Sequence, residues 1–191
     1  MPLFLLSSAI ALNFGGFFLY VVSAPAFIYD VLRLAETDFA YLCVPAIAGV
    51  MLGAFLSGRL AGRITPRGTV RIAYFIMFGA ALFNVTYSAA APPALPWSVL
   101  PVMIYGMGMA LAMPSITLLA LELFPHNRGM TASLQGFEHS FVAAIVAGMV
   151  SPFLSASAFM LALGMALFAA MGFVSWVLYL VLGRRARTAA C

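Results

Sequence analysis

Charged side chains are scarce in this sequence, and lysine is absent. Charged residues make up 7% of the 191 residues and hydrophobic residues 65%, whereas soluble domains carry about 25% charged residues. So little polar surface cannot coat a water-facing protein, which excludes a soluble globular domain. The positive charge comes from arginines spaced between apolar runs, with no single basic face. Nucleic acid is therefore not an expected partner.

Cysteine is nearly absent as well. Cys43 lies within an apolar run and Cys191 is the last residue, so the two cysteines offer neither a disulfide framework nor metal-ligand spacing. We therefore expect no metal and no cofactor. The first apolar run has no basic residues in front of it and is longer than a signal-peptide core, so we interpret it as a membrane helix and expect no cleavage.

Long apolar runs fill the chain instead. Helices are predicted over about 3–28, 39–60, 70–90, 95–121, 130–153 and 157–182. About 20 apolar residues at 1.5 Å per residue match the ~30 Å hydrocarbon core of a bilayer. The sequence thus predicts an all-α membrane protein in which residues 1–191 form a single domain of six transmembrane helices, with no soluble domain and lipid as its solvent.

The connections between these runs differ in charge. Arg33 lies in the first connection beside Asp30, Glu36 and Asp38, while the third and fifth connections are uncharged. The other arginines lie in the second connection, the fourth connection and the tail, at positions Arg59, Arg63, Arg67, Arg71, Arg128, Arg184, Arg185 and Arg187. Because cytoplasmic loops are rich in basic residues, these segments and both termini are predicted to be cytoplasmic.

Small residues recur at a spacing of four, which allows close helix contact. The pairs are Gly49 with Gly53, Gly58 with Gly62, and Gly108 with Ala112. Two glycines followed by a proline occur in both the first and the fourth apolar run. This similar placement indicates two three-helix repeats.

Three stretches of the chain resemble a known transporter family. Residues 14–27 resemble the seventh helix of major facilitator superfamily drug exporters of the Bcr/CflA type, in positions Phe14, Gly15, Gly16, Tyr20, Ser23, Ala24, Pro25 and Phe27. Residues 58–63 look like the degenerate second copy of the family's cytoplasmic loop motif, with residues Gly58, Arg59, Gly62 and Arg63, and Arg67 just beyond. Gly62 stands where the first copy carries Asp. The tenth helix, its loop and the start of the eleventh are matched by Pro114, Phe124, Pro125, Gly129, Ala132, Ser133, Gly136 and Phe137.

The resemblance implies the C-terminal six-helix half of a twelve-helix drug and proton antiporter of a bacterial inner membrane. That half is one bundle of two inverted three-helix repeats, which exports amphipathic small molecules together with an N-terminal half or by self-association. The family's main proton-coupling carboxylates belong to the N-terminal half and correspond to no residue here. A fragment, a split half and a self-sufficient unit all remain open. The alternative function is a non-transporting membrane subunit, or a half-transporter, that acts only by binding a partner polypeptide.

An enzyme is not expected. An intramembrane serine protease needs a Gly-x-Ser-Gly motif, and Ser57 is preceded by Phe55 and Leu56.

The resemblance also implies that the first and fourth helices line the transport cavity. Helical spacing then groups Asn13, Phe17 and Tyr20 on one stripe of the first helix and Met103 and Met107 on one stripe of the fourth. Thioethers and aromatic rings suit loosely specific binding because they repack around different shapes. Ordinary helix packing is the alternative explanation for both stripes.

Gln135, Glu138 and His139 form the most polar group inside any apolar run. Counted from Met130 at 1.5 Å per residue, Glu138 lies roughly 12 Å into the membrane. An ionised acid there costs about 3 kcal/mol, so an intramembrane ionisable residue is a functional candidate. Glu138 and His139 are predicted to couple transport to protons, with Gln135 in the cavity lining and within reach of both. The alternative is a structural polar cluster that holds this helix against the first or second one. Related exporters usually carry an apolar residue and Gln at the positions of Glu138 and His139.

Overall fold

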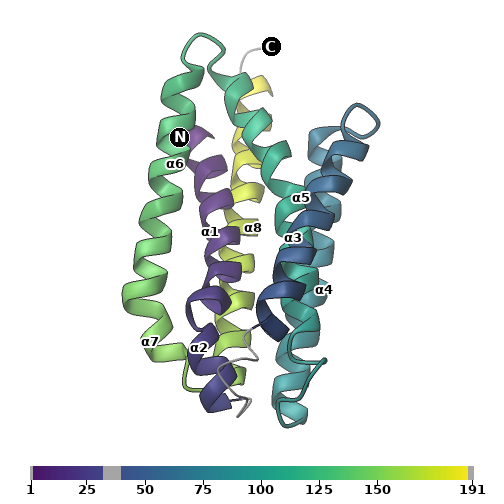
Figure 1. The fold of residues 1–191 in the computed structure, drawn as a ribbon. Coiled ribbons are helices and arrows are strands. Elements are labelled where there is room, and N and C mark those ends of the chain that lie inside the picture. Colours follow the sequence, from purple (N-terminus) through teal and green to yellow (C-terminus); the bar gives the residue numbers. More distant parts are fainter. Residues whose placement is uncertain (1, 32–39, 189–191) are drawn as a thin grey trace.

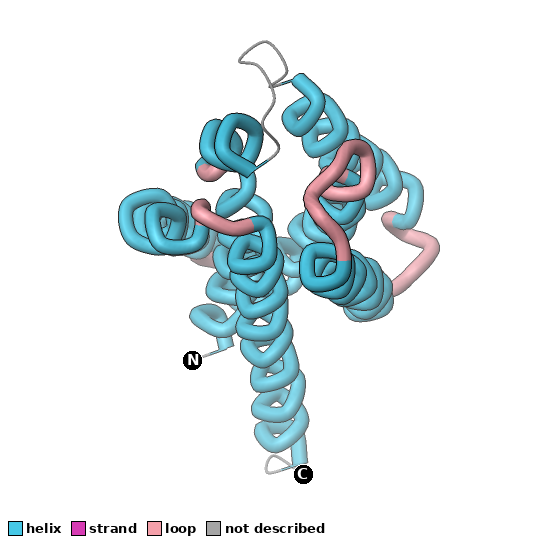
Figure 2. The backbone as a smooth tube through the Cα atoms, turned by 90° about the horizontal axis from the view of Figure 1, so that it is seen from below, coloured by secondary structure: helices cyan, strands magenta, loops and turns pink. Residues whose placement is uncertain are grey.

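Long helices make up almost the whole described chain. The computed structural model describes residues 2–31 and 40–188, and that part contains no strand. Within it, six helical spans are long and apolar enough to cross a membrane, which confirms the predicted all-α, six-span architecture. The side view in Figure 1 and the view from below in Figure 2 show these helices joined by short connections. The chain is a multi-pass membrane protein.

Several residues used to predict the orientation lie outside the described part. They are Arg33, Glu36 and Asp38 of the first connection, the side chain of Asp30, and the side chains of Arg184, Arg185 and Arg187 in the tail.

The first three spans are interrupted or capped where the sequence contains proline and glycine. Helix α1 (Pro2–Val22) continues through the short α2 (Ala24–Ala26) into a π-helical turn (Phe27–Val31). Pro25 coincides with this break because proline has no N–H for the helical ladder. Helix α3 (Ala40–Leu60) is followed by Gly62, whose φ of 79° is left-handed and suits glycine at a helix end. Helix α4 covers Pro66–Ala90.

The last three spans also contain one interrupted helix, here the second of the three. Helix α5 (Leu100–Leu123) has Pro114 in its interior. Helix α6 (Arg128–Ile145) continues through a π-helical turn (Val146–Val150) into α7 (Ser151–Leu154). Helix α8 covers Ala158–Thr188. The Ser23 and Ser151 hydroxyl groups lie 2.8 Å apart and join the two interrupted spans by a hydrogen bond.

Two helix starts differ from the prediction. Helix α4 begins at Pro66 and not at Val70, because the Thr65 hydroxyl caps it by accepting from the Gly68 N–H at 3.2 Å. Arg67 and Arg71 interrupt the apolar residues at this end of α4, so the length of the apolar run does not reveal where the helix starts. Helix α5 begins at Leu100 and not at Leu95, because the preceding connection is proline-rich and forms turns.

The helices exchange partners between the two halves of the sequence. Helix α1 packs against α8, α6 and α5, while α5 packs against α4, α3 and α1. If α1, α3 and α4 correspond to α5, α6 and α8, the α1–α8 contact corresponds to the α5–α4 contact, and the α1–α6 contact corresponds to the α5–α3 contact. A two-fold repeat requires this correspondence. Figure 1 shows the resulting groups, with α1, α6 and α8 on one side and α3, α4 and α5 on the other. The central helices α1 and α5 are the most buried spans of the described chain, and α3 and α6 the least.

The two ends of the described bundle differ in charge. The start of α1, the end of α8 and the α3–α4 and α5–α6 connections all lie at the upper end in Figure 1. Arg59, Arg63, Arg67 and Arg128 are therefore at one end of the bundle, and the uncharged connection of residues 91–99 is at the other.

Candidate functional site

A small polar cluster lies between α1 and α6. The Ser8 hydroxyl donates to Glu138 Oε2 at 3.3 Å, which is long for such a bond. Glu138 and Gln135 are each only 9% exposed. Within the described chain, Glu138 Oε1 and Gln135 Nε2 are buried without any hydrogen-bond partner. A buried acceptor and a buried donor are thus available one helical turn apart.

The sequence positions this cluster through helical periodicity. Thr131, Gln135 and Glu138 are the buried residues of α6, and they recur every three or four positions. Phe137 and Phe141 are exposed on the same helix and stack at a centroid distance of 5.9 Å. Helix α6 therefore turns its polar stripe toward α1 and its phenylalanines outward. Within the described chain, Gln135 Nε2 makes no hydrogen bond to Glu138 or His139, although the amide was predicted to reach both.

His139 lies beside this cluster without pairing with Glu138. Its ring centroid is 3.9 Å from that of Phe14, with 35° between the planes. Phe14 in turn stacks on Phe18 at 5.2 Å. Successive residues of a helix point about 100° apart, so His139 meets aromatic rings of α1 while Glu138 meets Ser8.

The predicted polar residues of α1 lie inside the bundle. Asn13 and Tyr20 are each 1% exposed. Asn13 Nδ2 donates to the Tyr74 hydroxyl of α4 at 2.9 Å, and Asn84 Nδ2 of α4 donates to the Tyr20 hydroxyl at 2.7 Å. The Tyr105 hydroxyl of α5 donates to the Asn13 carbonyl at 3.1 Å. Their partners are therefore helices of this bundle, and their role in lining a transport cavity stays a prediction.

Phe17 is packed in the same interior. It is buried, and a Cβ added to Gly106 of α5 would lie 2.9 Å from its ring. The glycine thus leaves room for this aromatic side chain between α1 and α5.

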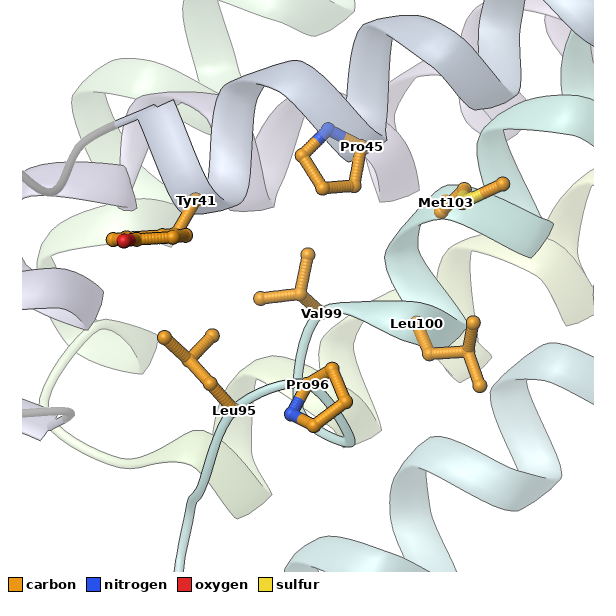
Figure 3. A pocket seen from close by; sticks show the side chains of 7 residues that line it. All are labelled: Tyr41, Pro45, Leu95, Pro96, Val99, Leu100 and Met103. Carbon is orange, nitrogen blue, oxygen red and sulfur yellow. The ribbon is translucent and has the colours of Figure 1, made fainter.

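The two predicted methionines of α5 lie along α3. Gly49 and Gly53 pack directly on the backbone carbonyls of Met103 and Met107. This contact realises the close approach expected for that glycine pair, whereas nothing lies within 4 Å of a Cβ added to Gly58 or Gly62. Met103 also lines an apolar cavity of about 420 Å³, together with Tyr41, Pro45, Leu95, Pro96, Val99 and Leu100 (Figure 3).

The loop-motif residues divide into distinct environments. The Arg59 guanidinium lies 4.9 Å from the ring centroid of Phe55, within cation–π range. Arg63 lines a second cavity, under the α3–α4 connection. Arg67 is exposed in the first turn of α4. Within the described residues, no group of three metal-ligating side chains occurs.

Sequence reasoning missed several partners in these networks. Ser8, Tyr74, Asn84 and Tyr105 were not singled out. Asn84 offered a signal, because an amide within an apolar span needs a partner. The other three belong to residue types common in membrane helices, so the sequence alone gave no reason to select them.

Comparison with known proteins identifies the family. The sequence profile of the Major Facilitator Superfamily matches residues 1–148, and the chain belongs to this superfamily. It is 26% identical over 114 residues to an uncharacterized MFS-type transporter, EfpA, in two strains of Mycobacterium tuberculosis, covering 60% of this chain and 22% of that protein. It is also 26% identical over 136 residues to an uncharacterized MFS-type transporter, YdgK, of Bacillus subtilis, covering 71% of this chain and 34% of YdgK. The chain therefore spans only a minor part of the length of these relatives.

Proposed function

We propose that this chain acts as the C-terminal six-helix half of a secondary transporter that exports amphipathic small molecules in exchange for protons. The observation that carries the proposal is the buried carboxylate of Glu138, with one oxygen unpartnered, inside a chain of the Major Facilitator Superfamily. The Bcr/CflA-type drug antiporters remain the subfamily that its motifs resemble most.

Glu138 supplies the group that gains and loses the proton. It lies within a predicted membrane span, where an isolated charge is costly. Within the described chain its carboxyl group accepts one long hydrogen bond, from Ser8, and the other oxygen has no partner. Gln135 Nε2 is the adjacent donor for a polar group of the substrate.

The large apolar faces of α3 and α6 support a second bundle as partner. These spans are the least buried in the described chain, and alternating access requires one bundle to move against another. An N-terminal six-helix half or a second copy of this chain supplies that bundle. By the charge of the connections, both termini face the cytoplasm of a bacterial inner membrane.

Everted membrane vesicles test this proposal. The chain is expressed alone and with an N-terminal half from the same superfamily, and the uptake of a cationic dye and proton release are recorded after energisation. We expect dye-dependent proton release with the partner half, its loss in Glu138→Gln, and its retention in Glu122→Gln, the matched removal of an exposed carboxylate at the end of α5.

Two outcomes contradict the proposal. Equal proton release by Glu138→Gln and the parent removes Glu138 from the coupling step. Binding of the partner half without any dye transport supports the non-transporting subunit instead.

A further inference from the structure

The cavity under the α3–α4 connection is not used by the proposed transport site. It has a volume of about 440 Å³, within the range of small-ligand sites. Three segments enclose it: the last turn of α3, the connection with the start of α4, and α5 from its proline onward. Its lining residues are Ser57, Ala61, Gly62, Arg63, Ile64, Thr65, Pro66, Thr69, Pro114, Ser115 and Leu118.

Hydroxyl groups on opposite walls of this cavity are free to bind a ligand. Ser57 of α3 is only 9% exposed and lines the cavity. Thr69 returns its hydroxyl to the Thr65 carbonyl at 3.4 Å, whereas no hydrogen bond engages the hydroxyls of Ser57 and Ser115 within the described chain. Both hydroxyls can therefore donate to an acceptor atom of a ligand in the cavity.

The charge around the cavity is positive, and no acidic residue near it in the sequence neutralises this charge. Arg63 contributes its side chain to the wall. No acidic residue lies between Asp38 and Glu122 in the sequence, and none lines the cavity. The Arg59 guanidinium lies over the ring of Phe55 on its own helix. Arg63 therefore supplies the guanidinium group of this cavity. Guanidinium groups bind phosphate through two parallel hydrogen bonds.

The rim of the cavity carries two exposed apolar side chains, one from α5 and one from the α3–α4 connection. Leu118 is 48% exposed and Ile64 is also exposed, although both line the cavity. Arg63, Thr65 and Thr69 lie where α3 ends and α4 begins, which is the depth of lipid headgroups for spans of this length. A ligand that fits both parts has a phosphate group joined to hydrocarbon chains.

We propose that this cavity binds the phosphodiester headgroup of an anionic phospholipid. Arg63 binds the phosphate oxygens, Ser57 and Ser115 donate hydrogen bonds, and the acyl chains leave over Leu118 of α5. The shared chemistry is an anionic phosphate, and the apolar rim selects the lipid over free phosphate.

Native mass spectrometry of the purified chain in detergent tests the site. The probes are phosphatidylglycerol, zwitterionic phosphatidylcholine and inorganic phosphate. We expect one phosphatidylglycerol to remain bound per chain under conditions that remove phosphatidylcholine, and phosphate not to displace it. Arg63→Gln should weaken its binding about tenfold, the effect of one lost charge-assisted pair. Ser57→Ala, which leaves the charge unchanged, should weaken it about fivefold.

Arg128→Gln is the matched control, because it removes an exposed arginine from the start of α6, at the same end of the bundle. Its effect should stay under about threefold, since it removes no hydrogen bond from the cavity. Equal weakening by Arg63→Gln and Arg128→Gln would show that lipid binding depends on the overall surface charge and not on this cavity, which would overturn the proposed site. Displacement by inorganic phosphate would overturn the assignment to lipid. Unchanged melting temperatures without lipid show that the variants remain folded.

Discussion

Asn84 of α4 donates a hydrogen bond of 2.7 Å to the hydroxyl of Tyr20 in α1, across 64 positions of sequence. Both side chains are almost fully buried. The bond therefore joins the first and third spans where water cannot replace it.

Tyr20→Phe should destabilise the protein by about 0.5–2 kcal/mol, because it leaves the Asn84 amide without its acceptor in an apolar interior. Unfolding in mixed micelles with increasing dodecyl sulfate measures this change. Tyr87→Phe is the control, since the Tyr87 hydroxyl donates to the Pro92 carbonyl at an exposed site. Equal stability of Tyr20→Phe and Tyr87→Phe would show that the buried bond contributes nothing.

Gly49→Ala should destabilise the protein by about 1–3 kcal/mol, because the new methyl group overlaps the Met103 carbonyl and forces α3 away from α5. Gly79→Ala adds the same methyl group to α4 where nothing lies within 4 Å. There we expect no loss, and a gain of up to about 1 kcal/mol from helix propensity. The same micelle titration compares both variants, and a tolerated Gly49→Ala would contradict the close packing of α3 and α5.

Ser8→Ala should alter the environment of Glu138 with little effect on folding. The hydrogen bond from Ser8 is long, so its loss should cost under about 1 kcal/mol. The infrared band of the Glu138 carboxyl group is identified by its absence from Glu138→Gln, and we expect this band to shift in Ser8→Ala. Ser140→Ala changes an exposed serine of α6, the helix that carries Glu138, and should leave that band in place. An unshifted signal in Ser8→Ala would disprove the contact.

The predicted orientation can be checked with single cysteines in a Cys43→Ser, Cys191→Ser background; Cys191 lies outside the described residues. Ala94→Cys and Gly129→Cys introduce thiols at opposite ends of the bundle, both at exposed positions. A membrane-impermeant maleimide should label Ala94→Cys in intact cells and Gly129→Cys only after permeabilisation. The reverse pattern would place the arginine-rich end outside the cell.

The six spans were predictable from sequence because each one depends only on its own run of apolar residues. Gly49 and Gly53 were predictable for a similar reason, since two small residues four apart leave a flat surface whichever helix occupies it. Gly58 and Gly62 share that spacing but lie at the end of α3, where no helix covers them.

The polar contacts were much less predictable. Asn13 and Tyr20 were recognised as polar residues on one stripe, but their partners Tyr74 and Asn84 follow about 60 positions later. Helical spacing fixes the direction of a side chain relative to its own helix only. Which neighbour it meets depends on the packing of all the spans, and the same limit applies to Ser8 and Glu138.

The packing of α1 against α8 has a consequence for synthesis. Helix α1 ends at Val22 and α8 begins at Ala158, roughly 140 residues later. At about 5–20 residues per second, a ribosome needs on the order of ten seconds to cover that distance. Through this interval, the face of α1 that Gly172 will cover, including Asn13 Oδ1, lacks its final neighbour. Helix α1 is thus enclosed only after α8 has been made, and nascent chains stalled before α8 should be the species most readily taken by membrane proteases.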